Sequence, residues 1–163
     1  MRTQRTLRII AGLVLLFGTF AAGWIVGRTG IGAAVDPASL TDRERTFTER
    51  MKNVSLVGRF TIRGRENRDA TPDRYDISAV EKVGDDLWRF TVRMSDTGNV
   101  IVPITVPMRW VGDTPVIDMR NYSIPGLGTF SAHVVFDGDQ YAGTWDNPKV
   151  GGLMYGTIEK MLN

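Results

Sequence analysis

The sequence contains no cysteine and only one histidine, His133, among its 163 residues. Without cysteine the chain can form no disulfide, and it cannot carry the lipid that lipoproteins attach to an N-terminal cysteine. A lone histidine with no thiolate or second imidazole is a poor start for a transition-metal site. We therefore expect no disulfide framework, no lipoprotein anchor and no metal centre, and the sequence indicates no cofactor.

The sequence motifs of common catalytic sites are also missing. The chain has no Gly-x-Ser-x-Gly elbow, no Gly-rich phosphate loop with a lysine and no His-Glu-x-x-His helix. Asp137, Asp139 and Asp146 follow His133, but they lack the glycine and glutamate positions of a calcium loop, and turn chemistry explains them. We therefore expect a non-catalytic protein. The alternative is an enzyme, in which two or more of His133, Asp137, Asp139 and Asp146 would converge in one cleft.

Charge is absent from the run between Ile9 and Val26, and Arg2, Arg5 and Arg8 precede this run. As a helix it would be roughly 27 Å long, close to the hydrocarbon thickness of a bilayer. Arginines before an apolar run keep the N-terminus in the cytoplasm. We predict a single-pass signal anchor in an inner membrane, with an extracytoplasmic (periplasmic) domain; the alternative is a signal peptide cleaved near residues 32–34.

Two glycines within that run, Gly23 and Gly27, have the spacing that lets two membrane helices approach closely. The pair predicts a homodimer through the lipid-embedded segment. The alternative is that these glycines have no partner, because glycine is common in apolar helices.

The net charge gives no reason to expect nucleic acid as a partner. It is +2 for the whole chain, but four of the 20 basic residues lie at or before Arg28, in the anchor and its flanks. The remaining 16 basic residues face 18 acidic ones, a net charge of −2. A domain with balanced charge has no electrostatic attraction to phosphate backbones.

The chain divides into three parts. Residues 1–28 form the cytoplasmic tip and anchor, residues 29–39 form a tether without periodicity, and residues 40–163 are long enough for one domain with a single core. The domain is expected to begin with a helix that runs to about Asn53, because Thr41 and Glu44 have the spacing of a capping box.

The apolar stripe of this helix is narrow. It contains Leu40, Phe47, Met51 and Val54. A stripe of this width predicts a helix packed against a sheet or covering its edge, rather than one buried in a bundle.

From Ser55 onward the apolar residues recur with the period of two that is typical of strands. Turn residues interrupt the pattern, most clearly at Asp137-Gly138, a pair that favours tight hairpins. Eight antiparallel strands are predicted, so the fold is mainly β, either a sandwich or an up-and-down barrel. The predicted strands are residues 56–63, 75–83, 87–94, 100–110, 115–119, 129–136, 140–145 and 153–160.

Two prolines bear on the choice between these architectures. Pro103 and Pro107 have the same parity in one strand, so their missing N–H groups would face the same neighbour. A closed, regular barrel is therefore less favoured. Either this strand is an edge on that side, or it bends out of one pairing partway.

Aromatic residues and glycines concentrate in and near the turns. Read as a functional feature, they form the rim of a pocket or a partner surface, and the glycines permit close approach. Read as a structural feature, tryptophan and tyrosine close the core while glycines relieve twisted strand ends. The candidate ligand-binding residues are Trp88, Phe90, Trp110, Phe130, Tyr141 and Trp145.

The run from Leu56 to Glu159, which is most of the chain, resembles known bacterial proteins. The segments Trp110-Val-Gly-Asp-Thr-Pro-Val-Ile117, Ile124-Pro-Gly-Leu-Gly-Thr-Phe130 and Tyr141-Ala-Gly-Thr-Trp145 resemble uncharacterised membrane-anchored proteins of planctomycete-type bacteria, a resemblance that implies no activity. Gly143-Thr-Trp145, followed by Gly151-Gly152 and Gly156-Thr-Ile158, looks like the closing hairpin of bacterial lipocalin-like β domains. That resemblance implies a carrier of a lipophilic ligand, although lipocalins have their Gly-x-Trp in the first strand, where this chain has Gly58-Arg-Phe60.

The sequence favours a non-catalytic domain that binds or positions a partner at the cell envelope. The alternative is a lipocalin-like carrier that holds a small apolar ligand between Trp88, Phe90, Trp110, Phe130 and Trp145. A partner-binding module would have this set packed solid, with aromatic residues displayed outside. A carrier would have an internal cavity of at least about 300 Å³ lined by it.

Overall fold

A computed structural model describes residues 32–161, apart from residues 66, 95–99 and 125–127. The predicted anchor between Ile9 and Val26, with Gly23 and Gly27, lies outside the described residues. No helix within the described part of the chain is long and apolar enough to span a membrane. Residues from Ala34 onward form one compact unit, which contains every strand of the fold.

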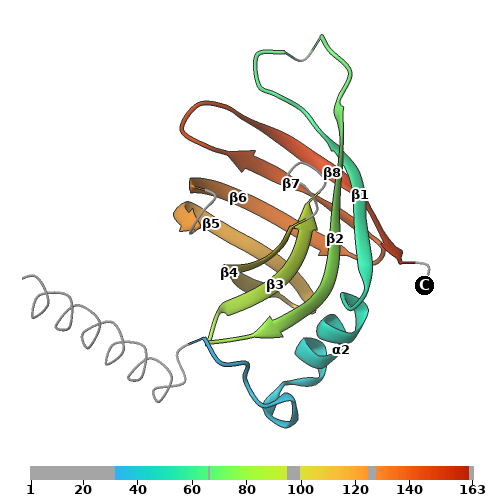
Figure 1. Ribbon diagram of the computed structural model, residues 1–163, viewed down its shortest axis with the longest axis vertical. Coiled ribbons are helices and arrows are strands. Elements are labelled where there is room, and N and C mark those ends of the chain that lie inside the picture. The colour runs from blue at the N-terminus through green and yellow to red at the C-terminus, as the bar shows by residue number, and fades with distance from the viewer. Residues whose placement is uncertain (1–31, 66, 95–99, 125–127, 162–163) are drawn as a thin grey trace, which may run out of the picture. The chain divides into compact units, whose positions relative to one another are not determined.

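Eight antiparallel strands close into a single barrel (Figure 1). Each strand pairs with the next in sequence, and β1 pairs with β8 through seven residue pairs from Val54↔Lys160 to Phe60↔Met154. The predicted mainly β fold with eight strands is confirmed, and the sandwich alternative is wrong. The strands are β1 Val54–Phe60, β2 Thr71–Lys82, β3 Leu87–Met94, β4 Ile101–Val111, β5 Thr114–Ile124, β6 Gly128–Asp137, β7 Gln140–Asp146 and β8 Gly151–Lys160.

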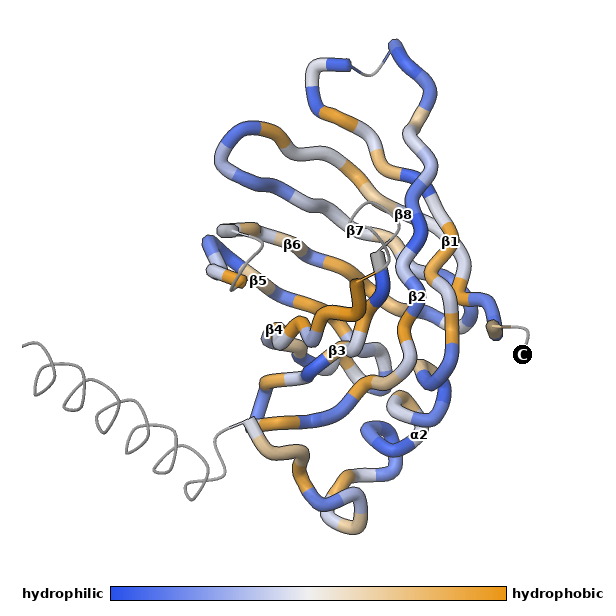
Figure 2. The backbone as a smooth tube through the Cα atoms, in the orientation of Figure 1, coloured by the Kyte–Doolittle hydropathy of each residue, from blue (hydrophilic) through white to orange (hydrophobic). Residues whose placement is uncertain are grey.

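Alternating side chains explain why these segments form barrel strands, and Figure 2 shows the alternation of hydropathy along them. In β3, Trp88, Phe90 and Val92 are buried at 0%, 5% and 5% exposure, while Arg89 pairs with Glu81 of β2 at 2.8 Å. Successive side chains of a strand point to opposite faces, so one face fills the barrel and the other meets water. The predicted hairpin at Asp137-Gly138 is confirmed, with Gly138 at a φ of 51°.

The barrel closes in spite of Pro103 and Pro107 because β4 changes its pairing partway. Residues 101–107 pair with β3, whereas the pairing with β5 covers only the four pairs from Met108↔Ile117 to Val111↔Thr114. The Met108 amide donates to the carbonyl of Asp86, before β3, at 2.7 Å. Backbone amides alternate in direction along a strand, and the Met108 amide faces the β3 side. The nitrogens of both prolines therefore face the β5 side. Among the described residues, this part of β4 has no pairing with β5, so no hydrogen bond of the sheet is lost there.

Strand β5 extends beyond the predicted residues 115–119. It continues to Ile124 through a bulge between Met119 and Tyr122, where Asn121 has a φ of 47° and donates its amide to Ser131 Oγ at 2.9 Å. The bulge adds a residue to the strand and breaks the period of two, so pattern reading ends the strand too early.

One end of the barrel is covered by helix α2, Asp42–Arg50, which follows the short 3-10 helix η1, Pro37–Ser39 (Figure 1). The predicted stripe is buried, with Leu40 8%, Phe47 2%, Met51 0% and Val54 1% exposed. The helix ends at Arg50, a few residues before the predicted Asn53, where the backbone enters the left-handed region with a φ of 53°.

Polar contacts fix α2 to the strands. Glu44 Oε2 accepts the amide of Thr41 at 2.9 Å, and Glu44 Oε1 accepts from Lys82 Nζ of β2 at 2.6 Å. Burial raises the pKa of the Glu44 carboxyl, but the hydrogen bonds from Lys82 and Thr41 outweigh it, so the pKa lies below its usual value. Arg43 lies over the ring of Trp110 at 5.0 Å and donates to the Gly112 carbonyl at 2.9 Å.

Candidate ligand-binding cavity

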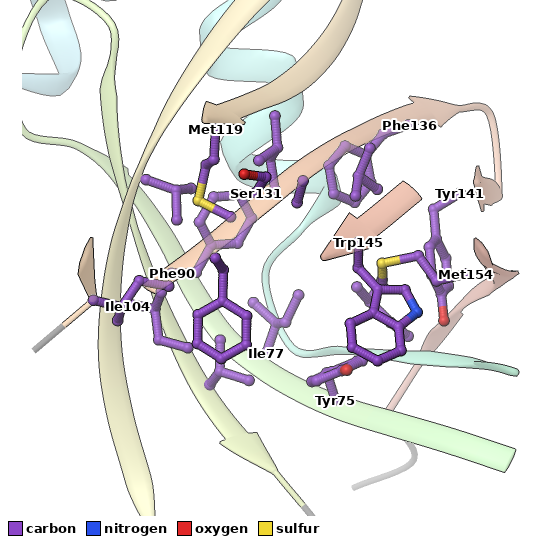
Figure 3. A pocket seen from close by; sticks show the side chains of 18 residues that line it. Tyr75, Ile77, Phe90, Ile104, Met119, Ser131, Phe136, Tyr141, Trp145 and Met154 are labelled. Carbon is purple, nitrogen blue, oxygen red and sulfur yellow. The ribbon is translucent and has the colours of Figure 1, made fainter. Parts of the chain in front are cut away.

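The barrel interior contains a cavity of about 240 Å³. All eight strands contribute to its wall, and the lining is apolar except for the hydroxyl groups of Tyr75, Ser131 and Tyr141 and the indole nitrogen of Trp145 (Figure 3). Small eight-stranded barrels are either filled by their own side chains or hold one small molecule. This barrel combines a filled end beneath α2 with a hollow further along.

The six candidate residues divide between these two regions. Phe90, Phe130, Tyr141 and Trp145 line the cavity. Trp88 and Trp110 pack instead against Phe47 of α2, with ring centroids at 5.8 Å and 5.9 Å. Phe47 also contacts Phe90 at 6.5 Å and Phe136 at 5.8 Å. The two tryptophans therefore belong to the packed end.

Most of the cavity wall consists of residues that the sequence analysis did not select, and most of these residues are aliphatic. Their signal is present in the sequence as the inward-facing positions of each strand, but the same pattern describes a solid core. Only the tertiary arrangement shows that space remains between them. These residues are Leu56, Tyr75, Ile77, Val92, Ile104, Val106, Ile117, Met119, Ile124, Ser131, Ala132, Val134, Phe136 and Met154.

The wall formed by β7, β8 and β1 pairs large side chains with glycines. Tyr141 and Trp145 of β7 lie opposite Gly156 and Gly152 of β8. A Cβ atom on Gly58 of β1 would collide with the Tyr141 hydroxyl and with the Tyr155 carbonyl. The Tyr141 side chain therefore crosses the bare backbone of β8 and places its hydroxyl over Gly58 of β1.

Trp145 reaches the same strand one inward position further along. Its ring meets Phe60 of β1 edge to face, at 5.6 Å and 89°. Gly58 and Phe60 are two residues apart, which is about 7 Å in an extended strand. Figure 3 shows Met154 beside both aromatic side chains, consistent with its position between Gly152 and Gly156 on β8.

Two polar atoms of this wall are buried without a hydrogen-bond partner among the described residues: the Tyr141 hydroxyl and Trp145 Nε1. Tyr141 is 2% exposed. Burial, and then the negative charge of Asp73, raise the pKa of the Tyr141 phenol to about 12. At neutral pH the phenol is therefore protonated and can donate a hydrogen bond, as the indole nitrogen can.

A second hollow of about 280 Å³ shares Tyr75, Phe130, Trp145 and Met154 with the cavity. Phe60 and Asp73 complete its wall. These residues lie at the strand ends opposite α2, near the start of β2, β6 and β8 and the end of β1 and β7. The hollow thus forms a mouth to the cavity, bordered by aromatic rings and one carboxylate.

The polar residues considered for catalysis or metal binding lie on the outer face or, in the case of Asp139, in the turn between β6 and β7. His133 is 43% exposed at its side chain, and its Nδ1 lies 3.1 Å from Asp118 Oδ1. Asp146 Oδ1 lies 3.0 Å from Arg63 Nη2 instead. Throughout the described ranges no cluster of three or more potential metal ligands occurs.

Comparison with known protein families, curated proteins and solved structures found no match for this chain. The class of protein is therefore defined by its own geometry. The chain forms an antiparallel eight-stranded barrel that is capped by a helix at one end and contains a mainly apolar pocket in its interior.

Proposed function

We propose that this domain binds one small, mainly apolar molecule inside its barrel. The observation that supports this function is the pocket of about 240 Å³ inside the barrel, because small eight-stranded barrels are otherwise filled by their own side chains. An empty cavity of this kind lowers stability, whereas a ligand that fills it raises stability by mass action. A binding role would explain why the fold keeps a cavity that lowers its stability when no ligand is bound.

The volume limits the size of the ligand. At about 240 Å³ the cavity is smaller than the 300 Å³ expected from the sequence for a carrier, and smaller than most sites for drug-sized molecules. It is larger than an engineered apolar cavity of about 150 Å³ that binds benzene. The ligand would therefore contain on the order of ten non-hydrogen atoms.

A substitution that fills the cavity with a larger side chain tests this function. Ala132 of β6 lines the cavity, and Ala142 of β7 is exposed on the outer face of the same sheet. We expect Ala132→Leu to occupy the space and to abolish the rise in melting temperature caused by an apolar probe such as cumene. The matched variant Ala142→Leu should keep this rise.

The free energy of unfolding of each variant shows whether a lost probe effect comes from a filled cavity or from an unfolded protein. Ala132→Leu should cost less than about 1.5 kcal/mol, because the cavity accepts the added methyl groups. Equal probe effects in both variants, or no effect of cumene on the wild type, would refute internal binding. If Ala132→Leu alone abolishes the probe effect, native mass spectrometry of the protein purified from its own envelope would identify the natural ligand.

The second candidate is the partner-binding module, and an outer apolar row favours it. Val135, Ala142 and Tyr155 are paired across β6, β7 and β8, and Val135 and Tyr155 are 40% and 47% exposed. Leu153, 55% exposed, adjoins them on β8. A photo-cross-linking residue at Tyr155 should then give a specific adduct in cells that the same residue at Asp85 does not, and identical adducts would argue against it.

The proposed setting is the outer side of an inner membrane, with the segment from Ile9 to Val26 as the anchor. The charge pattern of the N-terminal sequence supports this proposal. A barrel that is tethered by its N-terminus would handle its ligand close to the bilayer surface. The resemblance to membrane-anchored planctomycete-type proteins is in keeping with this location.

A further inference from the structure

We propose that the ligand is a neutral molecule with an oxygen acceptor, such as a ketone, ester or ether, which accepts a hydrogen bond from Tyr141 or Trp145. This inference rests on the proposed internal binding function and adds the chemical class of the ligand. It follows from the positions of two buried donors on one wall of a mainly apolar cavity, whose other polar side chains are Tyr75 and Ser131.

The two donors approach the same strand. The Tyr141 hydroxyl lies over Gly58, and the Trp145 ring lies against Phe60, the next inward-facing residue of β1. Glycines opposite both residues on β8 leave the side chains room to reach that strand. An acceptor placed along this wall would satisfy a donor that is otherwise buried without a partner, which is costly in an apolar surrounding.

The charge around the site selects against an anion. Asp73 is paired with Gly58 in the row that also contains Gly156 and Tyr141, and its negative charge opposes ionisation of the phenol. A carboxylate ligand beside Tyr141 would meet the same repulsion and would lose its hydration in an apolar cavity. A neutral oxygen meets neither cost.

Three probes of matched size test the proposal on the full chain in lipid nanodiscs, with empty nanodiscs as the control for partition into lipid. Cumene, acetophenone and benzoate have the same number of non-hydrogen atoms and differ in carrying no oxygen, a neutral carbonyl or a carboxylate. NMR titrations follow the indole N–H resonances, and loss of one resonance in Trp145→Phe assigns it to Trp145.

We expect acetophenone to bind and cumene to bind, but benzoate to bind at least about 10-fold more weakly than acetophenone. Tyr141→Phe or Trp145→Phe should weaken acetophenone about 3- to 10-fold, the effect of one hydrogen bond, without weakening cumene. Tyr155→Phe, which removes an exposed hydroxyl from the outer face, should change neither affinity.

The outcomes separate this inference from the function on which it rests. If cumene binds and neither variant changes the ratio of the two affinities, the hydrogen-bonding role is wrong and internal binding stands. If benzoate binds as tightly as acetophenone, the selection for a neutral ligand is wrong. If no probe binds the wild type, internal binding itself fails.

Discussion

Tyr141 shows how a single residue depends on its neighbours across three strands. Its hydroxyl reaches β1 only because Gly156 and Gly58 have no side chain in its path. The same arrangement buries the phenol, which needs a protonated state because an ionised oxygen would be poorly solvated there. The pKa of Tyr141 is raised to about 12 for this reason.

This shift predicts a loss of stability at alkaline pH. The folded-state pKa lies above the unfolded value of about 10, so the stability is fully present below pH 10 and is lost as the pH rises toward 12. Two pKa units correspond to about 3 kcal/mol. Urea unfolding between pH 9 and about pH 12 should therefore show a steeper decrease for the wild type than for Tyr141→Phe.

The comparison with Tyr141→Phe is needed because lysines and other tyrosines also titrate in this range. Tyr155→Phe serves as the matched control, because it removes a hydroxyl from a side chain that is 47% exposed on the outer face. Parallel profiles for the wild type and Tyr141→Phe would show that the Tyr141 phenol is not buried in the folded protein.

At the scale of the elements, α2 closes one end of the barrel. The helix presents few apolar residues, but Phe47 contacts four aromatic rings that belong to β3, β4 and β6. The packed end of the barrel is thus built around a residue from outside the sheet. The cavity lies beyond that end.

We expect Phe47→Ala to lower the free energy of unfolding by about 3–5 kcal/mol, because it removes a large buried side chain from an aromatic cluster. Glu49→Ala, at an exposed position of the same helix, should change it by less than about 0.5 kcal/mol. Denaturant unfolding of the two variants gives both values. A loss below about 1 kcal/mol for Phe47→Ala would mean that α2 does not close the barrel.

The helix also shows the limit of sequence reasoning at this scale. The spacing of Leu40, Phe47 and Met51 predicted the buried face of the helix, and this face is confirmed. An apolar stripe does not specify what the helix packs against. A helix that covers a sheet edge and a helix that closes a barrel end therefore have the same sequence pattern. The distances from Phe47 to Trp88 and Trp110 resolve this, and they also remove both tryptophans from the cavity wall.

At the scale of the whole molecule, the proposed anchor has a direct test. Leu15→Arg places a charge in the middle of the apolar run, at a cost of about 3 kcal/mol for insertion. We expect this variant to be lost from the membrane fraction or to fail in export, while Leu15→Ala should behave as the wild type. Unchanged fractionation of Leu15→Arg would exclude the anchor.

The sequence by itself determined that the chain folds as eight antiparallel strands after one short helix, because strand period, turn residues and helix caps are local properties. It also predicted the inward-facing residues of regular strands, such as Trp88, Phe90 and Val92 of β3, but not Ile124, which follows the bulge in β5. Closure depended on the tertiary structure, since Pro103 and Pro107 are tolerated only because β4 leaves its pairing with β5. The cavity also depended on the tertiary structure. Inward-facing residues can either fill a barrel or leave a cavity, and the outcome depends on how β7, β8 and β1 pack across their glycines.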